Sequence, residues 1–186
     1  MRQLLTAEEL AAGIDRLADA VRRDCGGRPL TLLGVLTGSI VLVADLLRRL
    51  EGPLEVGMVW ASSYRGAVTQ PGRLALRLDL LPDLTGRDVL LVDDIFDTGR
   101  TLAALVAALR SHGAASVKTL VLLRKPARTE VALVPDYVGF DIPDAFVVGY
   151  GLDYDGAWRN LPEICTLEPA DLSSPPGSPL PLPQAE

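Results

Sequence analysis

The chain alternates between short runs of consecutive apolar residues and longer segments in which apolar residues recur every three or four positions. Consecutive runs are typical of strands that are buried on both faces of a parallel sheet. They occur at Leu30–Leu36, Val56–Ala61, Leu74–Leu78, Val89–Val92 and Val117–Leu123, with shorter ones near Tyr137–Phe140 and Phe146–Tyr150. The pattern therefore predicts a central sheet of mainly parallel strands.

Helical spacing predicts three helices, one before the first strand and two between later strands. The first begins at Thr6, the second spans Ser39–Leu50, and the third follows the Val89–Val92 strand and stops at His112. Strands that alternate with helices favour an α/β fold whose parallel sheet is flanked by helices on both faces.

The composition changes sharply after Leu167. Residues 168–186 contain six prolines, three serines and no aromatic residue, so this segment has too little apolar surface to build a core. We expect one folded domain over residues 1–167 and a disordered tail over residues 168–186. A proline-rich docking peptide is the alternative interpretation of the tail.

Charge and cysteine content narrow the classes of function. A net charge of −6 and a pI near 4.8 argue against nucleic acid as the main partner. No signal-peptide pattern opens the sequence, and no apolar run is long enough to span a membrane. Cys25 and Cys165 lack metal-ligand spacing. We expect a reduced, cytoplasmic protein that binds neither nucleic acid nor membrane.

The segment Val89–Thr101 carries the most information about chemistry. Its apolar strand leads directly into Asp93 and Asp94, and a polar turn after Asp97 leads into the third helix. Open α/β sheets bind ligands at such junctions, beyond the carboxyl ends of their strands. Backbone N–H groups and hydroxyls at a helix start can hold a phosphate, and adjacent acids can accept ribose hydroxyls or help to hold Mg²⁺. Taken singly, each acid fits a turn or helix cap equally well.

Neither of the two common phosphate-binding motifs is present in this segment. It has no Gly-Lys-Ser/Thr of the Walker A type and no G-x-G-x-x-G fingerprint. Its polar positions instead fit a phosphorylated sugar.

The segment resembles the phosphoribosyl-pyrophosphate (PRPP) loop of type I phosphoribosyltransferases, and most closely that of their hypoxanthine-guanine branch. Residues 135–154 and 158–162 lie in the same family register, and the resemblance covers roughly residues 5–166. It implies the fold of that family, with a small hood over the purine site. It also implies Mg²⁺-dependent transfer of phosphoribose from PRPP to hypoxanthine or guanine, a purine-salvage reaction, by a homodimer or homotetramer.

The resemblance implies roles for the residues of the loop. Asp97 matches the general acid/base beside the purine. Asp93 and Asp94 match the acids that hold the ribose and, together with Asp153, Mg²⁺. The PRPP-binding set is completed by Thr98, Gly99, Arg100 and Thr101.

Purine recognition is implied for four further positions. Lys125 matches the lysine that hydrogen-bonds the purine 6-oxo group, which disfavours a 6-amino purine. Phe146 matches the residue that stacks on the base, and Val147 the backbone that reads its edge. Asp153 matches the group that meets the 2-amino edge of guanine. A lone loop lysine is usually a solvated charge and a lone phenylalanine is usually core, so these assignments rest on the motif.

Pyrophosphate binding is implied for Thr37, Gly38 and Ser39 at a helix start and for Arg159, whose planar guanidinium suits phosphate. Many relatives carry lysine where this chain has Thr37, so the chain lacks one cation there. The family often has a cis bond at this place, which corresponds to Leu36–Thr37. Ser63 and Tyr64, in the polar segment 62–72, match the pair in the lid that closes over the site.

Three alternative functions remain open at this stage. The closest is a xanthine-preferring phosphoribosyltransferase. A PRPP-sensing regulatory protein that binds RNA, similar to the pyrimidine-operon attenuator, is disfavoured by Asp97 and by the acidic composition. A non-catalytic scaffold is disfavoured because the implied site residues occur together.

Overall fold

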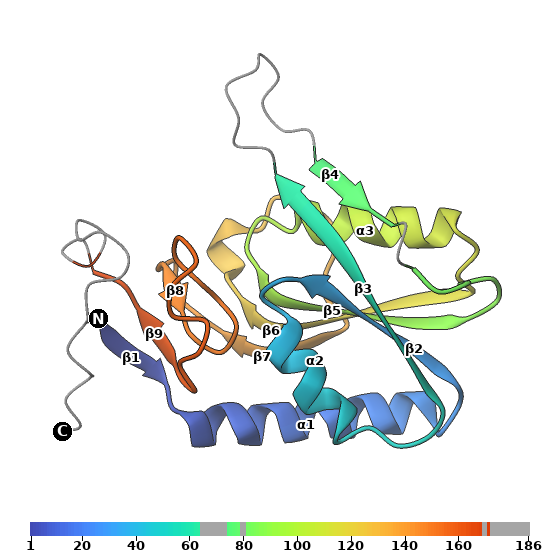
Figure 1. Ribbon diagram of the computed structural model, residues 1–186, viewed down its shortest axis with the longest axis horizontal. Helices are drawn as coiled ribbons and strands as arrows, with labels where there is room; N and C mark the ends of the chain where they lie inside the picture. The colour runs from blue at the N-terminus through green and yellow to red at the C-terminus, as the bar shows by residue number, and fades with distance from the viewer. Residues whose placement is uncertain (64–73, 79–80, 169–170, 172–186) are drawn as a thin grey trace, which may run out of the picture.

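The computed structural model describes residues 1–63, 74–78, 81–168 and 171. Its main sheet has the order β4-β3-β2-β5-β6-β7 (Figure 1). These strands are β2 (Leu30–Leu36), β3 (Leu54–Ser63), β4 (Leu74–Arg77), β5 (Asp88–Phe96), β6 (Ser116–Arg124) and β7 (Tyr137–Asp141). All neighbours pair in parallel except β3 and β4, which are antiparallel. The predicted, mainly parallel sheet is confirmed.

Helices cover both faces of this sheet. Helices α1 (Ala7–Cys25) and α2 (Ile40–Leu47) lie on one face, and α3 (Arg100–Ser111) lies on the other (Figure 1). Successive strand residues point to opposite faces: Leu90 packs in the cluster under α1 and α2, whereas Leu91 packs in the cluster under α3. Because both faces are covered, the strands consist of consecutive apolar residues.

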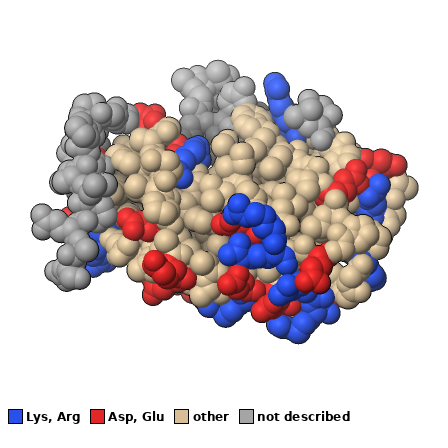
Figure 2. All heavy atoms as spheres, turned by 60° about the horizontal axis from the view of Figure 1, so that its bottom comes forward, with Lys and Arg blue, Asp and Glu red and all other residues tan. Residues whose placement is uncertain are grey.

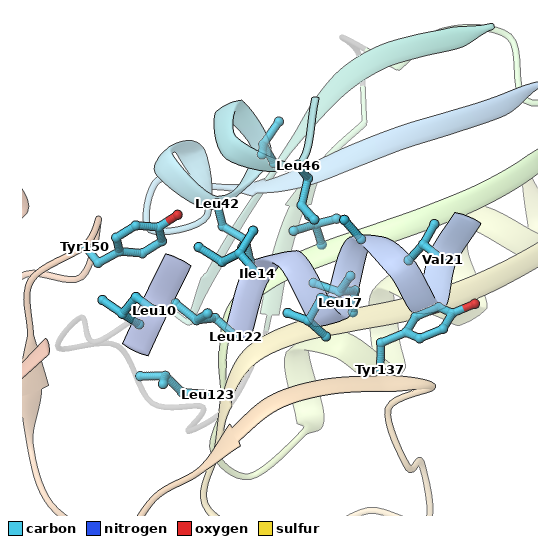
Figure 3. Close-up of a cluster of buried hydrophobic side chains, with 14 of the residues drawn as sticks. Leu10, Ile14, Leu17, Val21, Leu42, Leu46, Leu122, Leu123, Tyr137 and Tyr150 are labelled. Atoms are coloured by element: carbon cyan, nitrogen blue, oxygen red, sulfur yellow. The ribbon is translucent and has the colours of Figure 1, made fainter. Parts of the chain in front are cut away.

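Helix α1 is fixed at its start by a capping box and along its length by one apolar face. The Thr6 hydroxyl accepts the Glu9 N–H at 3.1 Å, and the Glu9 carboxylate accepts the Thr6 N–H at 2.8 Å. The buried stripe formed by Leu10, Ile14, Leu17 and Val21 faces the sheet beside Leu122 and Tyr137 (Figure 3). On the solvent face of this layer, acidic and basic side chains are interspersed (Figure 2).

A second, antiparallel sheet forms the hood. Its order is β1-β9-β8, with β1 (Arg2–Leu5), β8 (Val147–Val148) and β9 (Ile164–Thr166). Arg2 pairs with Thr166, so segments from opposite ends of the sequence lie side by side in the hood (Figure 1). A short 3₁₀ turn, η1 (Pro126–Arg128), follows β6.

Several predicted boundaries were wrong. Helix α2 ends at Leu47 and not at Leu50. The expected Phe146–Tyr150 strand is reduced to β8, because Gly149 and Tyr150 adopt φ of 99° and 47° and turn the chain. The Val89–Val92 strand extends to Phe96, so the acid pair belongs to β5 itself.

Some expectations fall largely outside the described residues. Ser63 is the last residue of β3, but Tyr64 and the rest of the implied lid lie beyond them, as does most of the proposed tail. Among the described helices, none has the length and apolarity needed to cross a membrane.

Candidate active site

The candidate site lies between β2 and β5, where the strand order of the sheet changes direction: the chain continues outward from β2 to β3 on one side and from β5 to β6 on the other. Strands β2 and β5 are neighbours, but the helices that follow them, α2 and α3, cover opposite faces of the sheet. Their pairing ends at Gly34 and Val92, and a crevice opens beyond it, as expected at such a switch point. The crevice holds a cavity of about 350 Å³ lined by Leu36, Thr37, Gly38, Asp93, Asp94, Asp97, Thr98, Gly99, Thr101, Asp153 and Arg159, among others.

Two adjacent acids form the floor of this cavity. Asp93 is only 8% exposed, and its burial, reinforced by the negative charge of Asp94, raises its pKa well above the ordinary range. Burial also raises the pKa of Asp94. Hydrogen bonds with the Asp93 side chain and from the Ile95 N–H, which donates to Asp94 Oδ1 at 2.7 Å, oppose this rise. A buried pair of like-charged acids is stabilised by a cation or by hydroxyl donors, so this floor suits a sugar or a metal.

The turn after β2 packs tightly against this pair. The peptide bond between Leu36 and Thr37 is cis, as the resemblance implied. Thr37 is exposed and lines the cavity, and the Cα of Gly38 touches the Asp94 carboxylate. Ser39 is fully buried and donates its hydroxyl to the Val35 carbonyl at 2.6 Å. It is absent from the residues that line the cavity, so the structure does not bring its side chain to the site.

The loop before α3 forms a second wall of the cavity. Gly99, the N-cap residue, adopts a left-handed φ of 80°, and the Thr98 hydroxyl beside it accepts the Arg100 N–H at 3.4 Å. Thr98 and Thr101 line the cavity, whereas Arg100 turns away and pairs with Glu130 at 2.6 Å. The first turn of a 12-residue helix thus borders the cavity, an arrangement that suits an anion.

A second cavity, of about 260 Å³, adjoins the first and shares Asp94, Ile95, Asp97 and Asp153 with it. Its remaining lining residues are Lys125, Phe146, Val147 and Leu152. The Lys125 side chain is 9% exposed, and its Nζ lies 4.0 Å from Asp97 Oδ2 and 3.6 Å from Asp144 Oδ1.

Phe146 supplies an apolar ring to this second cavity. The residue is 46% exposed, and its ring meets Tyr154 edge-on at a centroid distance of 5.5 Å. An exposed aromatic face beside a buried ammonium suits a flat, polar-edged ligand.

The hood contributes Asp153 and Arg159 to the first cavity. The Arg159 guanidinium donates to the Gly151 carbonyl at 2.6 Å and lies 2.6 Å from Asp153 Oδ1. The other Asp153 oxygen accepts the Gly156 N–H at 2.7 Å. Both oxygens of Asp153 are therefore engaged within the hood, and its approach to a metal would run through water or through its backbone.

Sequence reasoning missed Arg128, Asp144 and Gly151. Arg128 donates to Asp97, and Asp144 contacts both Arg128 and Lys125. The proximity of Arg128 to Lys125 along the chain was the one local signal available. Gly151 packs against the Gly38 carbonyl, which links the hood to the turn after β2.

Comparison with known proteins gives consistent matches. The phosphoribosyl transferase domain model matches residues 1–155. The chain is 40% identical over 166 residues to the hypoxanthine-guanine phosphoribosyltransferase of Lactococcus lactis, covering 89% of this chain and 90% of that protein. It is 42% identical over 166 residues to the bifunctional protein TilS/HprT of Listeria innocua, of which it spans only 26%.

A solved structure has the same fold. Hypoxanthine phosphoribosyltransferase from Trypanosoma cruzi, described as a ternary substrates complex, matches with a TM-score of 0.85 and 37% identity, covering 92% of this chain and 97% of that one. Together with the family match along residues 1–155, these similarities show that the chain belongs to the phosphoribosyltransferase family, within its hypoxanthine-guanine group.

Proposed function

We propose that this chain transfers the 5-phosphoribosyl group of PRPP to a 6-oxopurine, hypoxanthine or guanine, giving IMP or GMP and pyrophosphate in purine salvage. The observation that carries the proposal is the pair of adjoining cavities with Asp94 and Asp97 at their boundary. One cavity has the acids and helix start that suit a phosphorylated sugar, and the other has the ring and ammonium that suit a purine. The names of the relatives support the same reaction.

The residues divide the work according to the bonds that change. The start of α3, with Thr98 and Thr101, holds the 5-phosphate, and Asp93 and Asp94 accept the ribose hydroxyls and so orient C1′. The purine nitrogen forms a bond to C1′ as the bond from C1′ to pyrophosphate breaks. Asp97, at the junction of the cavities, takes the proton that the purine loses.

The purine cavity accounts for base choice. Lys125 donates to the 6-oxo group, and Phe146 stacks on the ring. The backbones of Val147 and Asp153 lie along the same wall and read the opposite edge. An amino group at the 6-position would face the ammonium of Lys125. Both groups are hydrogen-bond donors, so the two could not pair with each other.

The donor set at the cavity floor fits Mg²⁺. Asp93 and Asp94 offer hard oxygen ligands whose burial favours a neutralising cation. Within the described part of the chain no group of three side chains could ligate a metal by itself, so PRPP oxygens and water would complete the coordination. Bound Mg²⁺ neutralises charge on the pyrophosphate leaving group.

The leaving group itself meets the turn after β2 and the hood. Thr37 and Gly38 offer backbone groups, and Arg159 is the one cationic side chain among the described residues that line this cavity. Because Thr37 carries no charge, the stabilisation of pyrophosphate depends strongly on Arg159.

A steady-state assay tests this function directly. Purified chain is given PRPP and Mg²⁺ with hypoxanthine, guanine, xanthine, adenine or uracil in separate reactions. Nucleotide formation with hypoxanthine and guanine alone is the expected result. A preference for xanthine would show that hypoxanthine and guanine are not the main substrates. If no base gave a nucleotide, the proposal would be refuted.

The cellular setting follows from the same assignment. We propose that this chain works in the cytoplasm, as a homodimer or homotetramer. Light scattering of the purified chain measures the mass of the assembly, and a monomer at assay concentration would contradict this part.

A further inference from the structure

The segment after β6 packs along the loop that carries Asp97. The Lys125 N–H donates to the Phe96 carbonyl at 2.9 Å, and the Glu130 N–H donates to the Thr98 carbonyl at 3.0 Å. These bonds flank Asp97 on both sides in the sequence. The backbone around Asp97 is thereby held, but its carboxylate can still rotate about its final torsion, which has a broad energy minimum.

Arg128 contacts that carboxylate. Its Nε donates to Asp97 Oδ1 at 2.9 Å, and the other carboxylate oxygen, Asp97 Oδ2, lies 4.0 Å from Lys125 Nζ. One carboxylate oxygen is therefore anchored, and the other is directed toward the ammonium of the purine cavity.

Asp144 completes an alternating set of charges. It lies 3.8 Å from Arg128 Nη1 and 3.6 Å from Lys125 Nζ. Each of the two cations therefore faces the same two carboxylates. Asp144 is therefore a second carboxylate partner of Arg128, and it helps to keep the guanidinium in place.

We propose that Arg128 is a positioning residue for the phosphoribosyl transfer. It fixes Asp97 Oδ1 so that Oδ2 alone faces the purine and takes the proton that leaves the ring nitrogen. The inference rests on the proposed function, and specifically on Asp97 as the base. Its physical basis is that proton transfer requires hydrogen-bond distance and alignment, which an unanchored carboxylate attains only part of the time.

Direct binding of substrate does not account for Arg128. It lines neither of the two cavities, and its side chain is 46% exposed. Among the described residues, its side chain pairs with Asp97 and Asp144, both carboxylates of this chain.

The test is the kinetics of Arg128→Met beside the matched variant Arg124→Met. Arg124 also makes an ion pair with an aspartate, Asp141, at 2.6 Å, but it lies outside both cavities. We expect Arg128→Met to lower kcat about 10- to 100-fold, as for other outer-shell positioning groups, with KM for PRPP nearly unchanged. Arg124→Met should retain wild-type kinetics, and Arg128→Lys should recover part of the lost kcat.

A double variant makes the test specific. In an Asp97→Asn background, which lowers kcat by itself, adding Arg128→Met should cause almost no further loss, because the group that Arg128 positions is gone. An equal further loss in that background would overturn the proposal. So would a raised KM for PRPP with intact kcat, or wild-type kinetics of Arg128→Met.

The failures of the two proposals are distinguishable. A wild-type chain that forms no nucleotide from PRPP refutes the proposed function and this inference together. A wild-type chain that turns over, loses activity in Asp97→Asn and keeps it in Arg128→Met refutes this inference alone.

Discussion

The Asp94 carboxylate packs directly on the Cα of Gly38, with no space between them for a side chain. A Cβ at Gly38 would lie 1.4 Å from Asp94 Oδ2. The turn after β2 and the Asp94 carboxylate are therefore fitted to each other, and one methyl group would separate them.

Gly38→Ala should for this reason displace Asp94 and lower kcat/KM for PRPP about 100-fold, the usual effect of a displacement of about 1 Å. Steady-state kinetics with varied PRPP measure it. Gly26→Ala is the control, since a Cβ at Gly26 meets nothing within 4 Å and only its left-handed φ of 57° is strained. Equal activity of the two variants would show that the contact has no functional weight.

Asp93→Asn should stabilise the free protein and abolish its function. The pKa of Asp93 is raised by burial, so its contribution to stability is complete below the unfolded pKa of about 3.9 and is lost as pH rises through the folded pKa. At neutral pH the charged form is therefore unfavourable in the free protein. The variant should melt higher than wild type at pH 7, and the difference should shrink toward pH 4.

Asp141→Asn is the control for Asp93→Asn, because it should change the stability at pH 7 in the opposite direction. Hydrogen bonds from Arg124 lower the pKa of Asp141, so this acid stabilises the fold above its unfolded pKa, and that stability is lost as pH falls through the folded pKa. Its loss should cost about 0–1 kcal/mol at pH 7, because the pair is half exposed and screened. If Asp93→Asn instead melted at a lower temperature than wild type at pH 7, the charged Asp93 carboxylate would not destabilise the free protein.

Lys125→Ala should weaken discrimination between 6-oxo and 6-amino purines. The ratio of kcat/KM for hypoxanthine to that for adenine should fall about 100-fold or more, because the variant lacks the proposed donor to the 6-oxo group. Lys118→Ala is a matched control, since Lys118 is the other lysine of the sequence and pairs with Asp24 at 2.8 Å, outside both cavities. An unchanged ratio would remove Lys125 from base recognition.

Tyr150→Phe should reduce stability. The Tyr150 hydroxyl is buried and donates to Asp45 of α2, and burial raises its pKa. Loss of this hydrogen bond should lower the free energy of unfolding by about 1–2 kcal/mol, the lower part of the range for hydrogen bonds to charged groups. The effect should be this small because Asp45 keeps its ion pairs with Arg48 and Arg49. Urea unfolding measures the change.

Tyr154→Phe serves as the control for Tyr150→Phe, because the Tyr154 hydroxyl makes no hydrogen bond within the described residues. It should leave the free energy of unfolding nearly unchanged. Equal losses in the two variants would mean that the bond to Asp45 contributes little.

The strands and helices with strong local signals were predictable. Leu30–Leu36 is apolar because both faces of β2 are covered, and the start of α1 is marked by the Thr6 and Glu9 capping box. The extension of β5 through Asp93 and Asp94 was not predictable, because acids are rare in strands. There, backbone pairing with β6 continues regardless of side chain, from Asp93 opposite Val121 to Phe96 opposite Arg124.

The site was predictable where the family motif specifies it. Asp97, Lys125 and Phe146 do line one cavity. The contact of Arg128 with Asp97 was not predictable, because it depends on the 3₁₀ turn after β6 and on the side-chain rotamer. The burial of Ser39 likewise depends on how its hydroxyl meets the Val35 carbonyl one turn back.

The pairing of Arg2 with Thr166 determines the order in which the two sheets can form during synthesis. Strands β2 to β7 lie between residues 30 and 141, so the main sheet can assemble while the chain is still being made. β1 has to wait for residues 164–166 to leave the ribosome before it gains its partner. The hood sheet is thus completed only after the strands of the main sheet, because its first and last strands come from opposite ends of the sequence.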